Sequence, residues 1–199
     1  MSRKTYFNEV AETWDKQYCT PQLASFLEKL VSQFGLKPGQ NVLDVGTGTG
    51  VLIPYLVNAV GPSGSVVAVD YAEKMLRVCK SKHAHLDNVS VGLHDVEEDD
   101  LPSESFSAVT CFGLFPHLTE KEKALRNMNR ALKPGGTLII AHALGSEEIK
   151  AHHAEAASSV MNDTLPEEAE MRRLLKRTGF SGIHIKDEHG CYFCVSTKV

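Results

Sequence analysis

Apolar segments of strand length alternate with helical patterns along this chain, and this alternation restricts the possible folds more than any other feature. The helical patterns place apolar residues three and four positions apart, whereas the strand-like segments are mostly apolar. Such alternation is typical of a mostly parallel sheet with helices on both faces. The strand-like segments are residues 41–45, 66–70, 89–94, 107–112, 137–141, 183–186 and 192–196.

The last two segments flank a short, turn-rich link at residues 187–190, which favours an antiparallel hairpin. We therefore predict an α/β three-layer sandwich with a seven-stranded, mostly parallel sheet and an antiparallel last strand. Of the 199 residues, 42% are hydrophobic, and no linker-like segment divides them. A single domain over residues 1–199 is expected.

Charge and cysteine content limit the classes of function. A net charge of −4 offers no general basic surface for nucleic acid or an acidic membrane. No apolar run approaches the length of about 18 residues that a membrane-spanning helix needs. The first residues lack the apolar stretch of a signal peptide, and the five scattered cysteines do not suggest disulfides, so a cytoplasmic location is expected. Cys191 and Cys194 have Cys-x-x-Cys spacing, but they are expected to be ordinary packed thiols.

Several helix ends can be predicted from local signals. Pro54 is expected in the first turn of a helix that starts near Val51, where its missing N–H costs little. Residues 119–122 (Thr-Glu-Lys-Glu) have a capping-box pattern and are predicted to open a helix. A polar, histidine-rich insert at residues 146–165 is predicted to be helical, and Gly179 is placed to end the last helix.

The segment most informative about function is residues 42–50, where an apolar strand leads into a glycine-rich turn and then a helix. Glycine permits a tight turn and lets a ligand approach bare backbone. Asp70 ends the second strand, where a carboxylate can accept hydrogen bonds from both hydroxyls of a ribose. The two features together predict a nucleoside-containing ligand at the carboxyl edge of the sheet.

The spacing of the glycines separates two classes of nucleoside cofactor. A dinucleotide site has Gly-x-Gly-x-x-Gly, whose third small residue would be at position 51, which is Val here. The glycines instead follow Asp44 at Gly46, Gly48 and Gly50, and this pattern resembles motif I of the class I S-adenosylmethionine-dependent methyltransferases. An NAD-dependent oxidoreductase on a Rossmann sheet is the alternative that shares the glycine turn.

Further segments resemble this methyltransferase family, in its order and spacing, over about residues 5–141. They are residues 7–15, similar to the lid helix of many small-molecule members, and residues 70–76, 94–102, 106–111 and 132–138. Ala108 stands where many members have Asp, and we interpret that position as structural. The resemblance implies an N-terminal lid at residues 1–20 and an acceptor-side insert at residues 146–165.

The resemblance also implies S-adenosylmethionine as cofactor, with S-adenosylhomocysteine as product. Asp44 would approach the methionine amino group, and Asp70 would accept the ribose hydroxyls. The other implied cofactor-binding residues are Gly46, Thr47, Gly48, Tyr71, Met75, Asp95, Val96, Phe112 and Gly113. Structural alternatives stand beside these roles: Asp44 as a helix cap, Asp95 as a solvated charge and Met75 as a core residue.

Candidates for the acceptor side follow the fourth and fifth strands. His117 and His142 are the predicted catalytic residues, since an ordinary imidazole titrates near pH 6.5 and suits a base at neutral pH. Tyr6, Trp14 and His152 are predicted to contact the acceptor. His142, His152, His153 and Asp163 match no compact set of metal ligands, so no metal site is predicted.

These observations predict a methyltransferase that moves a methyl group from S-adenosylmethionine to a small-molecule acceptor by in-line displacement. Orientation of donor and acceptor alone can supply roughly 7–11 kcal/mol of barrier reduction. A non-catalytic relative that binds the nucleoside is a second alternative. RNA and protein acceptors are less favoured because the acidic residues 97–100 would repel phosphate near the acceptor. No nucleic-acid or membrane partner is expected.

Overall fold

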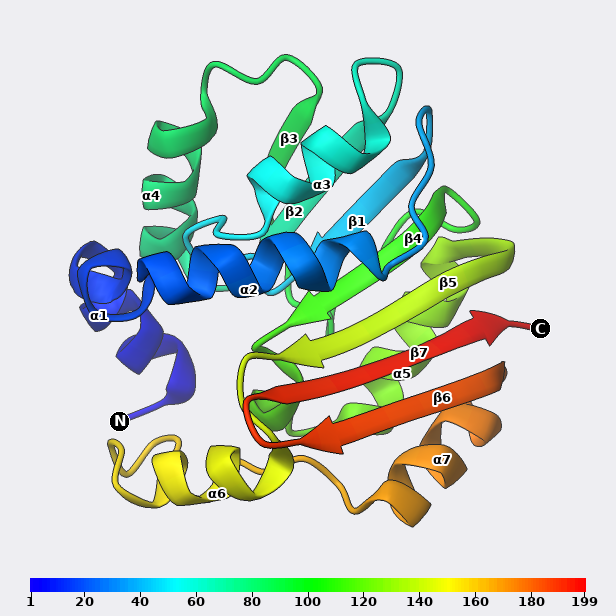
Figure 1. The fold of residues 1–199 in the computed structure, drawn as a ribbon. Coiled ribbons are helices and arrows are strands. Elements are labelled where there is room, and N and C mark those ends of the chain that lie inside the picture. The colour runs from blue at the N-terminus through cyan, green and yellow to red at the C-terminus, as the bar shows by residue number, and fades with distance from the viewer.

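Seven strands form one sheet in the order β3-β2-β1-β4-β5-β7-β6 (Figure 1), and the computed structural model describes residues 1–199. β7 is antiparallel to both of its neighbours, whereas the pairs formed among the first five strands are parallel. The predicted α/β sandwich with an antiparallel last strand is therefore confirmed. The strands are β1 (Asn41–Val45), β2 (Ser65–Asp70), β3 (Val89–Leu93), β4 (Phe106–Phe112), β5 (Leu132–His142), β6 (Phe180–Glu188) and β7 (Cys191–Lys198).

Helices cover both faces of this sheet and make the three layers (Figure 1). The helices are α1 (Arg3–Tyr18), α2 (Pro21–Ser32), α3 (Ile53–Val60), α4 (Glu73–His83), α5 (Lys121–Ala131), α6 (Ser146–Ala154) and α7 (Glu168–Arg177), with a 3-10 turn η1 (Phe115–His117). Leu27 of α2 and Leu56 of α3 are buried together against one face. Met128 of α5 and Leu175 of α7 are buried against the other.

The alternation of side chains along β1 explains why its sequence is mostly apolar. Val42 belongs to the core under α2 and α3, whereas Leu43 and Val45 belong to the core under α5 and α7. Successive side chains of a strand point to opposite faces, so a strand covered on both faces needs apolar residues at every position. Asp44 is the exception in this strand and lies at the functional edge.

Two of the predicted helix ends are confirmed, and one is wrong. Pro54 lies in the first turn of α3, and Gly179 follows α7 with a φ of +86°. The capping box predicted from Thr119 is absent, since α5 begins at Lys121 without a side-chain cap. The Thr119 hydroxyl instead accepts a hydrogen bond from Arg3, and the N–H of Glu120 donates to the Glu97 carboxylate. A tertiary partner therefore replaces the local cap.

Two other segments differ from the prediction in extent. β5 begins at Leu132 rather than at residue 137, because Leu132 already pairs with Phe106 of β4 ahead of a register shift. The insert at residues 146–165 is helical only over α6, and residues 155–165 follow as turns and irregular chain. None of the helices combines the length and the apolar character needed to span a bilayer.

The first helix and the insert lie beyond the carboxyl ends of β4 and β5, at the left of Figure 1. α1 packs on α4 through a small cluster made of Ala11, Ala72 and Met75, and it does not join the two main cores. Ligands of open α/β sheets bind beyond the carboxyl ends of the strands. The fold thus brings two segments far apart in the sequence to the edge where a ligand is expected.

Candidate active site

The turn after β1 brings backbone donors and a carboxylate together where the sheet order reverses, between β1 and β4. The Gly48 N–H donates to Oδ2 of Asp70 at 2.9 Å, and the Ala72 N–H donates to its Oδ1 at 2.8 Å. Burial raises the pKa of Asp70, while these N–H bonds act in the opposite direction. Each oxygen keeps a lone pair, so the oriented carboxylate can still accept two ligand hydroxyls.

Gly46 is the position of this turn that tolerates a side chain least. We expect Gly46→Ala to lower the free energy of unfolding more than Gly35→Ala does. The two glycines have φ of +69° and +68°, so the left-handed strain of about 1–2 kcal/mol is common to both variants. A Cβ at Gly46 would lie 2.6 Å from Cδ2 of Leu114, whereas nothing lies within 4 Å at Gly35. Overpacking adds about 1–3 kcal/mol. Urea unfolding measures the difference. Equal losses of unfolding free energy in the two variants would mean that Leu114 can move aside without destabilising the protein.

A first cavity, of about 200 Å³, opens over the glycine turn. Five of the predicted cofactor residues line it: Gly46, Asp70, Tyr71, Asp95 and Val96. The rest of the lining comes from the start of α1, from β1, and from the loops after β3 and β4, namely Ser2, Arg3, Lys4, Val45, His94, Glu97, Leu114, His117, Leu118 and Thr119. We call this space the cofactor cavity.

Six of the predicted cofactor residues do not line the cofactor cavity: Asp44, Thr47, Gly48, Met75, Phe112 and Gly113. Asp44 is buried behind the turn, where its Oδ1 accepts a bond of 2.7 Å from the Thr110 hydroxyl and its Oδ2 has no partner. Burial raises the pKa of Asp44 to about 6. Thr47 is also buried, with an unpartnered hydroxyl. Met75 packs between α1 and α4, which matches the structural alternative for that residue.

A second cavity, of about 580 Å³, lies beside the first and beneath α1 and α6. The predicted residues Tyr6, Trp14, Phe112, Gly113, His142 and His152 line it. Phe112 and Gly113, which the resemblance assigns to the cofactor, are among them. The other lining residues are Phe7, Tyr18, Cys19, Thr20, Gln22, Leu23, Phe26, Val51, His117, Ala143, Leu144, His153, Ala156 and Val160. No Asp, Glu, Lys or Arg is among them, and we call this space the acceptor cavity.

His142, at the end of β5, has an environment that disfavours its charged form. Burial, together with the nearby His117, His153 and His152, lowers the pKa of His142 to about 3. Its Nδ1 is buried without a hydrogen-bond partner. The prediction of an ordinary imidazole at this position is therefore wrong, because a neutral ring with so low a pKa is a weak proton acceptor.

The low pKa of His142 predicts a loss of stability in acid. An unfolded histidine binds a proton near pH 6.5, whereas folded His142 stays neutral down to about pH 3. The unfolded state therefore gains protons first, and stability falls as the pH drops below about 6.5, by about 1.4 kcal/mol per unit. We expect about 2 kcal/mol more loss between pH 7 and pH 5 in the wild type than in His142→Gln. Urea unfolding at the two pH values tests this, and parallel losses would show that His142 takes up a proton while folded.

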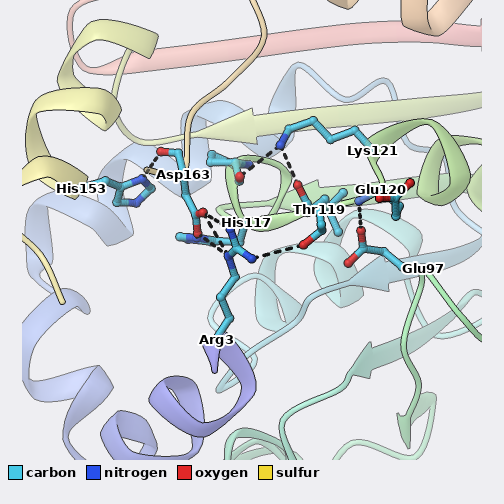
Figure 2. A network of polar contacts seen from close by, with 10 residues as sticks. Arg3, Glu97, His117, Thr119, Glu120, Lys121, His153 and Asp163 are labelled. Atoms are coloured by element: carbon cyan, nitrogen blue, oxygen red, sulfur yellow. Dashed lines mark hydrogen bonds and ion pairs between the residues drawn. The ribbon is translucent and has the colours of Figure 1, made fainter. Parts of the chain in front are cut away.

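His117 is the only residue that lines both cavities. Its Nδ1 lies 2.7 Å from Oδ2 of Asp163, and its ring meets Phe7 edge-on with 5.1 Å between centroids. Arg3 of α1 binds the same Asp163 carboxylate (Figure 2). Burial lowers the pKa of His117 and the bond to Asp163 raises it, with the pKa ending below its ordinary value. A neutral imidazole thus stands at the junction of the two cavities.

Several residues in or next to these cavities were given no site role by the sequence prediction. Arg3 and Asp163 lie 160 positions apart, so no local pattern could pair them. Tyr18 and Phe26 are aromatic residues of α1 and α2, but nothing in the sequence shows which face of these helices meets the insert. His83 is a further case, because its Nε2 lies 2.9 Å from the carbonyl oxygen of Gly50 and supports the glycine turn from below.

Polar contacts hold α1 against the rest of the protein at both of its ends. Lys4 pairs with Glu73 at 2.8 Å, and both side chains are largely exposed. Near the other end, Asp15 accepts from the Thr49 hydroxyl and pairs with Lys82 at 2.6 Å. No group of three or more His, Cys, Asp or Glu side chains is arranged to hold a metal ion. His153 instead lies 2.6 Å, through its Nδ1, from the backbone oxygen of Asp163.

Comparison with known proteins identifies relatives of this chain. Residues 42–136 match the family model described as a methyltransferase domain. The ubiquinone/menaquinone biosynthesis C-methyltransferase UbiE of Ectopseudomonas mendocina is 37% identical over 143 residues, which cover 67% of this chain and 55% of that protein. A demethylmenaquinone methyltransferase of Staphylococcus aureus is 39% identical over 113 residues, covering 56% and 46%. The chain spans about half the length of the curated relatives it matches.

Solved structures extend the likeness to nearly the whole chain. An S-adenosylmethionine-dependent methyltransferase from Aquifex aeolicus is 28% identical with a TM-score of 0.75, over 96% of this chain and 98% of that one. A phosphoethanolamine N-methyltransferase of Haemonchus contortus, 21% identical with a TM-score of 0.73 over 87% and 52%, shares the fold. The matched domain, the sheet order and the glycine turn together place the chain among the class I S-adenosylmethionine-dependent methyltransferases.

Proposed function

We propose that this protein transfers a methyl group from S-adenosylmethionine to a small, uncharged and largely apolar acceptor. The observation that carries the proposal is the meeting of two cavities at His117, one over the glycine turn and one lined by apolar side chains. A methyl donor in the first cavity and an acceptor in the second would approach each other at that junction. Holding two reactants in line is the main requirement of such a displacement.

The residues of the cofactor cavity fit an adenosyl compound. Asp70 offers two oriented oxygens for ribose hydroxyls, and Asp95 and Val96 offer a polar atom and an apolar surface for the adenine. Gly46 leaves bare backbone where a Cβ would collide with Leu114. The unpartnered Oδ2 of buried Asp44 suits a cationic amino group reached past Thr47. When bound, S-adenosylmethionine supplies an electrophilic methyl group that needs no further activation.

The acceptor cavity favours an uncharged molecule. Its lining contains no Asp, Glu, Lys or Arg side chain, and His142, one of its four histidines, stays neutral at pH 7. A charged acceptor would lose its hydration there without finding a partner, which costs several kcal/mol. Six aromatic side chains from α1, α2 and β4 would instead stack on an apolar or planar molecule; they are Tyr6, Phe7, Trp14, Tyr18, Phe26 and Phe112. The names of the UbiE and demethylmenaquinone relatives support a small-molecule acceptor.

The two predicted catalytic histidines receive different roles in this proposal. His117 has Asp163 on its Nδ1 and is the proton acceptor, placed where the two cavities meet. His142 is a weaker base, and its unpartnered Nδ1 suits a hydrogen bond that orients the acceptor. Base catalysis by His117 applies where the methylated atom first loses a proton.

Residues 1–20 act in this proposal as a lid, and residues 146–165 as the acceptor-side insert, within the single domain of residues 1–199. Side chains of the lid line both cavities, and His152, His153, Ala156 and Val160 of the insert line the acceptor cavity. The acidic residues 97–100 lie beside the cofactor cavity, where Glu97 lines the wall, rather than beside the acceptor cavity. No part of either cavity offers a basic groove suited to nucleic acid.

The direct test uses methyl-labelled S-adenosylmethionine with the purified protein and a small-molecule extract of the source cells. We expect labelled product in the organic-soluble, uncharged fraction, and micromolar to millimolar binding of S-adenosylhomocysteine by calorimetry. Label that enters only phosphorylated or charged metabolites would contradict the acceptor class. Binding without any labelled product would favour a non-catalytic nucleoside-binding protein, and absence of binding would overturn the whole proposal.

A further inference from the structure

We propose that Asp163 is a positioning residue for His117, and that Arg3 of the lid completes the pair, so that the proton acceptor is assembled only when α1 is closed. This inference rests on the proposed methyl transfer, because it concerns the same junction of the two cavities. It gives a role to Arg3 of the lid and to Asp163 of the insert. It also links the position of the lid to the state of the base.

Asp163 is held from three sides (Figure 2). Its side chain is only 2% exposed. Arg3 donates from Nε to both carboxylate oxygens at 3.0 and 2.8 Å, and its Nη2 also binds Oδ1. His117 approaches Oδ2 through Nδ1 at 2.7 Å, and His153 contacts the backbone oxygen of the same residue. A buried carboxylate with this many donors has one defined orientation.

The contact with Asp163 determines which ring nitrogen of His117 carries the proton. An ionised carboxylate only accepts hydrogen bonds, so His117 donates to it from Nδ1. Burial alone would raise the pKa of Asp163, but Arg3 and His117 outweigh it and bring this pKa to about 2, so the carboxylate is ionised. The neutral ring therefore keeps a lone pair on Nε2, which no other group of the protein binds. That lone pair is what a proton acceptor at the junction requires.

The charges around His117 come from every element packed against it. They are Arg3 of α1, Asp163 and the histidines His152 and His153 of the insert, His142 of β5, Glu97 after β3 and Lys121 of α5. Asp163 favours the protonated imidazole, whereas burial, His153 and Arg3 disfavour it. Lys121 is directed away, because its Nζ donates to the carbonyl oxygens of Pro116 and Leu118. Burial, with smaller contributions from His153 and Arg3, thus keeps the ring neutral even though a carboxylate touches it.

The dependence on the lid follows from where Arg3 lies. It occupies the first position of α1, and its bonds to Asp163 are the only hydrogen bonds between α1 and the insert. Arg3 also donates to the Thr119 hydroxyl, and the remaining polar ties of α1 lead to α4 and the glycine turn, through Lys4, Asn8 and Asp15. Because α1 lines both cavities, we expect ligands to exchange by movement of α1. Such movement withdraws Arg3 and leaves Asp163 and His117 without their third partner.

Nitrogen-detected NMR of the histidine side chains tests the inference directly. The protein is uniformly labelled with nitrogen-15 and measured with S-adenosylhomocysteine bound, so that α1 is closed. His117 is expected as the Nδ1–H tautomer, with a titration midpoint below its ordinary value. Asp163→Asn is expected to abolish this preference and shift the midpoint downward, whereas Arg3→Gln is expected to shift it upward. General loosening of the structure would not shift the titration midpoint of His117 in opposite directions in these two variants.

Lys82→Gln is the matched control, because Lys82 is also a cation that pairs with a residue of α1, Asp15, but it is not among the charges that act on His117. It should leave the tautomer and the midpoint of His117 unchanged. Fluorescence of Trp14, the only tryptophan of the chain and a residue of α1, reports the lid independently. Acrylamide quenching should increase in Arg3→Gln and Asp163→Asn, and removing S-adenosylhomocysteine should raise it in the wild type.

The outcomes separate this inference from the proposed function. Absence of S-adenosylhomocysteine binding or of labelled product in the wild type counts against the methyltransferase itself. A wild type that binds and transfers, but shows His117 as the Nε2–H tautomer or with equal shifts in both variants, overturns the positioning role alone. In the transfer assay, Asp163→Asn should lower the rate at saturating donor by about tenfold or more, a share of the roughly 10²–10⁴-fold that a general base supplies. Donor affinity should remain unchanged.

Discussion

Asp70→Ala is expected to weaken binding of S-adenosylhomocysteine by about 10²–10⁴-fold. The substitution removes two charged acceptors for the ribose hydroxyls, and hydrogen bonds to charged groups contribute about 1.5–3 kcal/mol each. Their sum, about 3–6 kcal/mol, converts to that range at about 1.4 kcal/mol per factor of ten. Isothermal titration calorimetry with the purified variant measures the loss.

Two further variants show whether this loss comes from the ribose contact. Asp70→Asn keeps the shape and one acceptor, so its loss should be intermediate. Asp100→Asn changes a carboxylate that is largely exposed and paired only with Arg130, so its affinity should equal that of the wild type. Because Asp70 also accepts from Gly48 and Ala72, circular dichroism and thermal unfolding must show that the Ala variant is folded. An unchanged affinity in a folded Asp70→Ala protein would falsify the assignment of the cofactor cavity.

His117→Ala is expected to lower the rate of methyl transfer by about 10²–10⁴-fold, which is the usual contribution of a general base. The variant keeps Asp70, Asp95 and the glycine turn, so the affinity for S-adenosylhomocysteine should change little. A base must be unprotonated, so the rate rises with pH through the pKa of His117. Burial lowers that pKa, and the acid limb of the wild-type profile should therefore lie below the ordinary histidine value of about 6.5. The limb should be absent in His117→Ala.

His189→Ala is the control for this prediction. Its side chain is 93% exposed in the β6–β7 turn and meets only Glu148, so transfer should proceed at the wild-type rate. A His117→Ala protein that binds the cofactor and transfers methyl at the wild-type rate would show that the acceptor loses no proton to this residue. In that case in-line orientation by the two cavities would account for the whole rate enhancement.

The local sequence was sufficient to predict the strand, the glycine turn and the helix start at residues 42–50. Residues 42–50 combine a doubly buried strand, a glycine turn and a helix start, and the three signals depend only on neighbouring residues. Asp70 could be assigned because parallel strands end at the same edge, so its place at the end of β2 puts it beside that turn. The same reasoning failed at Thr119, where a capping pattern was present but Arg3 and Glu97, both distant in sequence, supplied other partners.

The acceptor side was predictable only in outline. Tyr6, Trp14, His142 and His152, all predicted for the acceptor side, line one cavity, since the lid and the insert both lie beyond the carboxyl edge. The pKa of His142 was not predictable, because burial is a property of everything packed around the ring. The burial of Met75 was not predictable for the same reason. The resemblance gives its position after β2 to the cofactor, but α1 packs over it and makes it a core residue.

The sequence by itself determined the sheet, the glycine turn and the carboxylate at the end of β2, because each follows from residue types at neighbouring positions. Only the tertiary structure decided the division into two cavities, the neutral state of His142 and the union of Arg3, His117 and Asp163. These features depend on the distance between segments more than a hundred residues apart and on the water excluded between them. Distance and desolvation set the strength of electrostatic interactions, and both become defined only when the chain has folded.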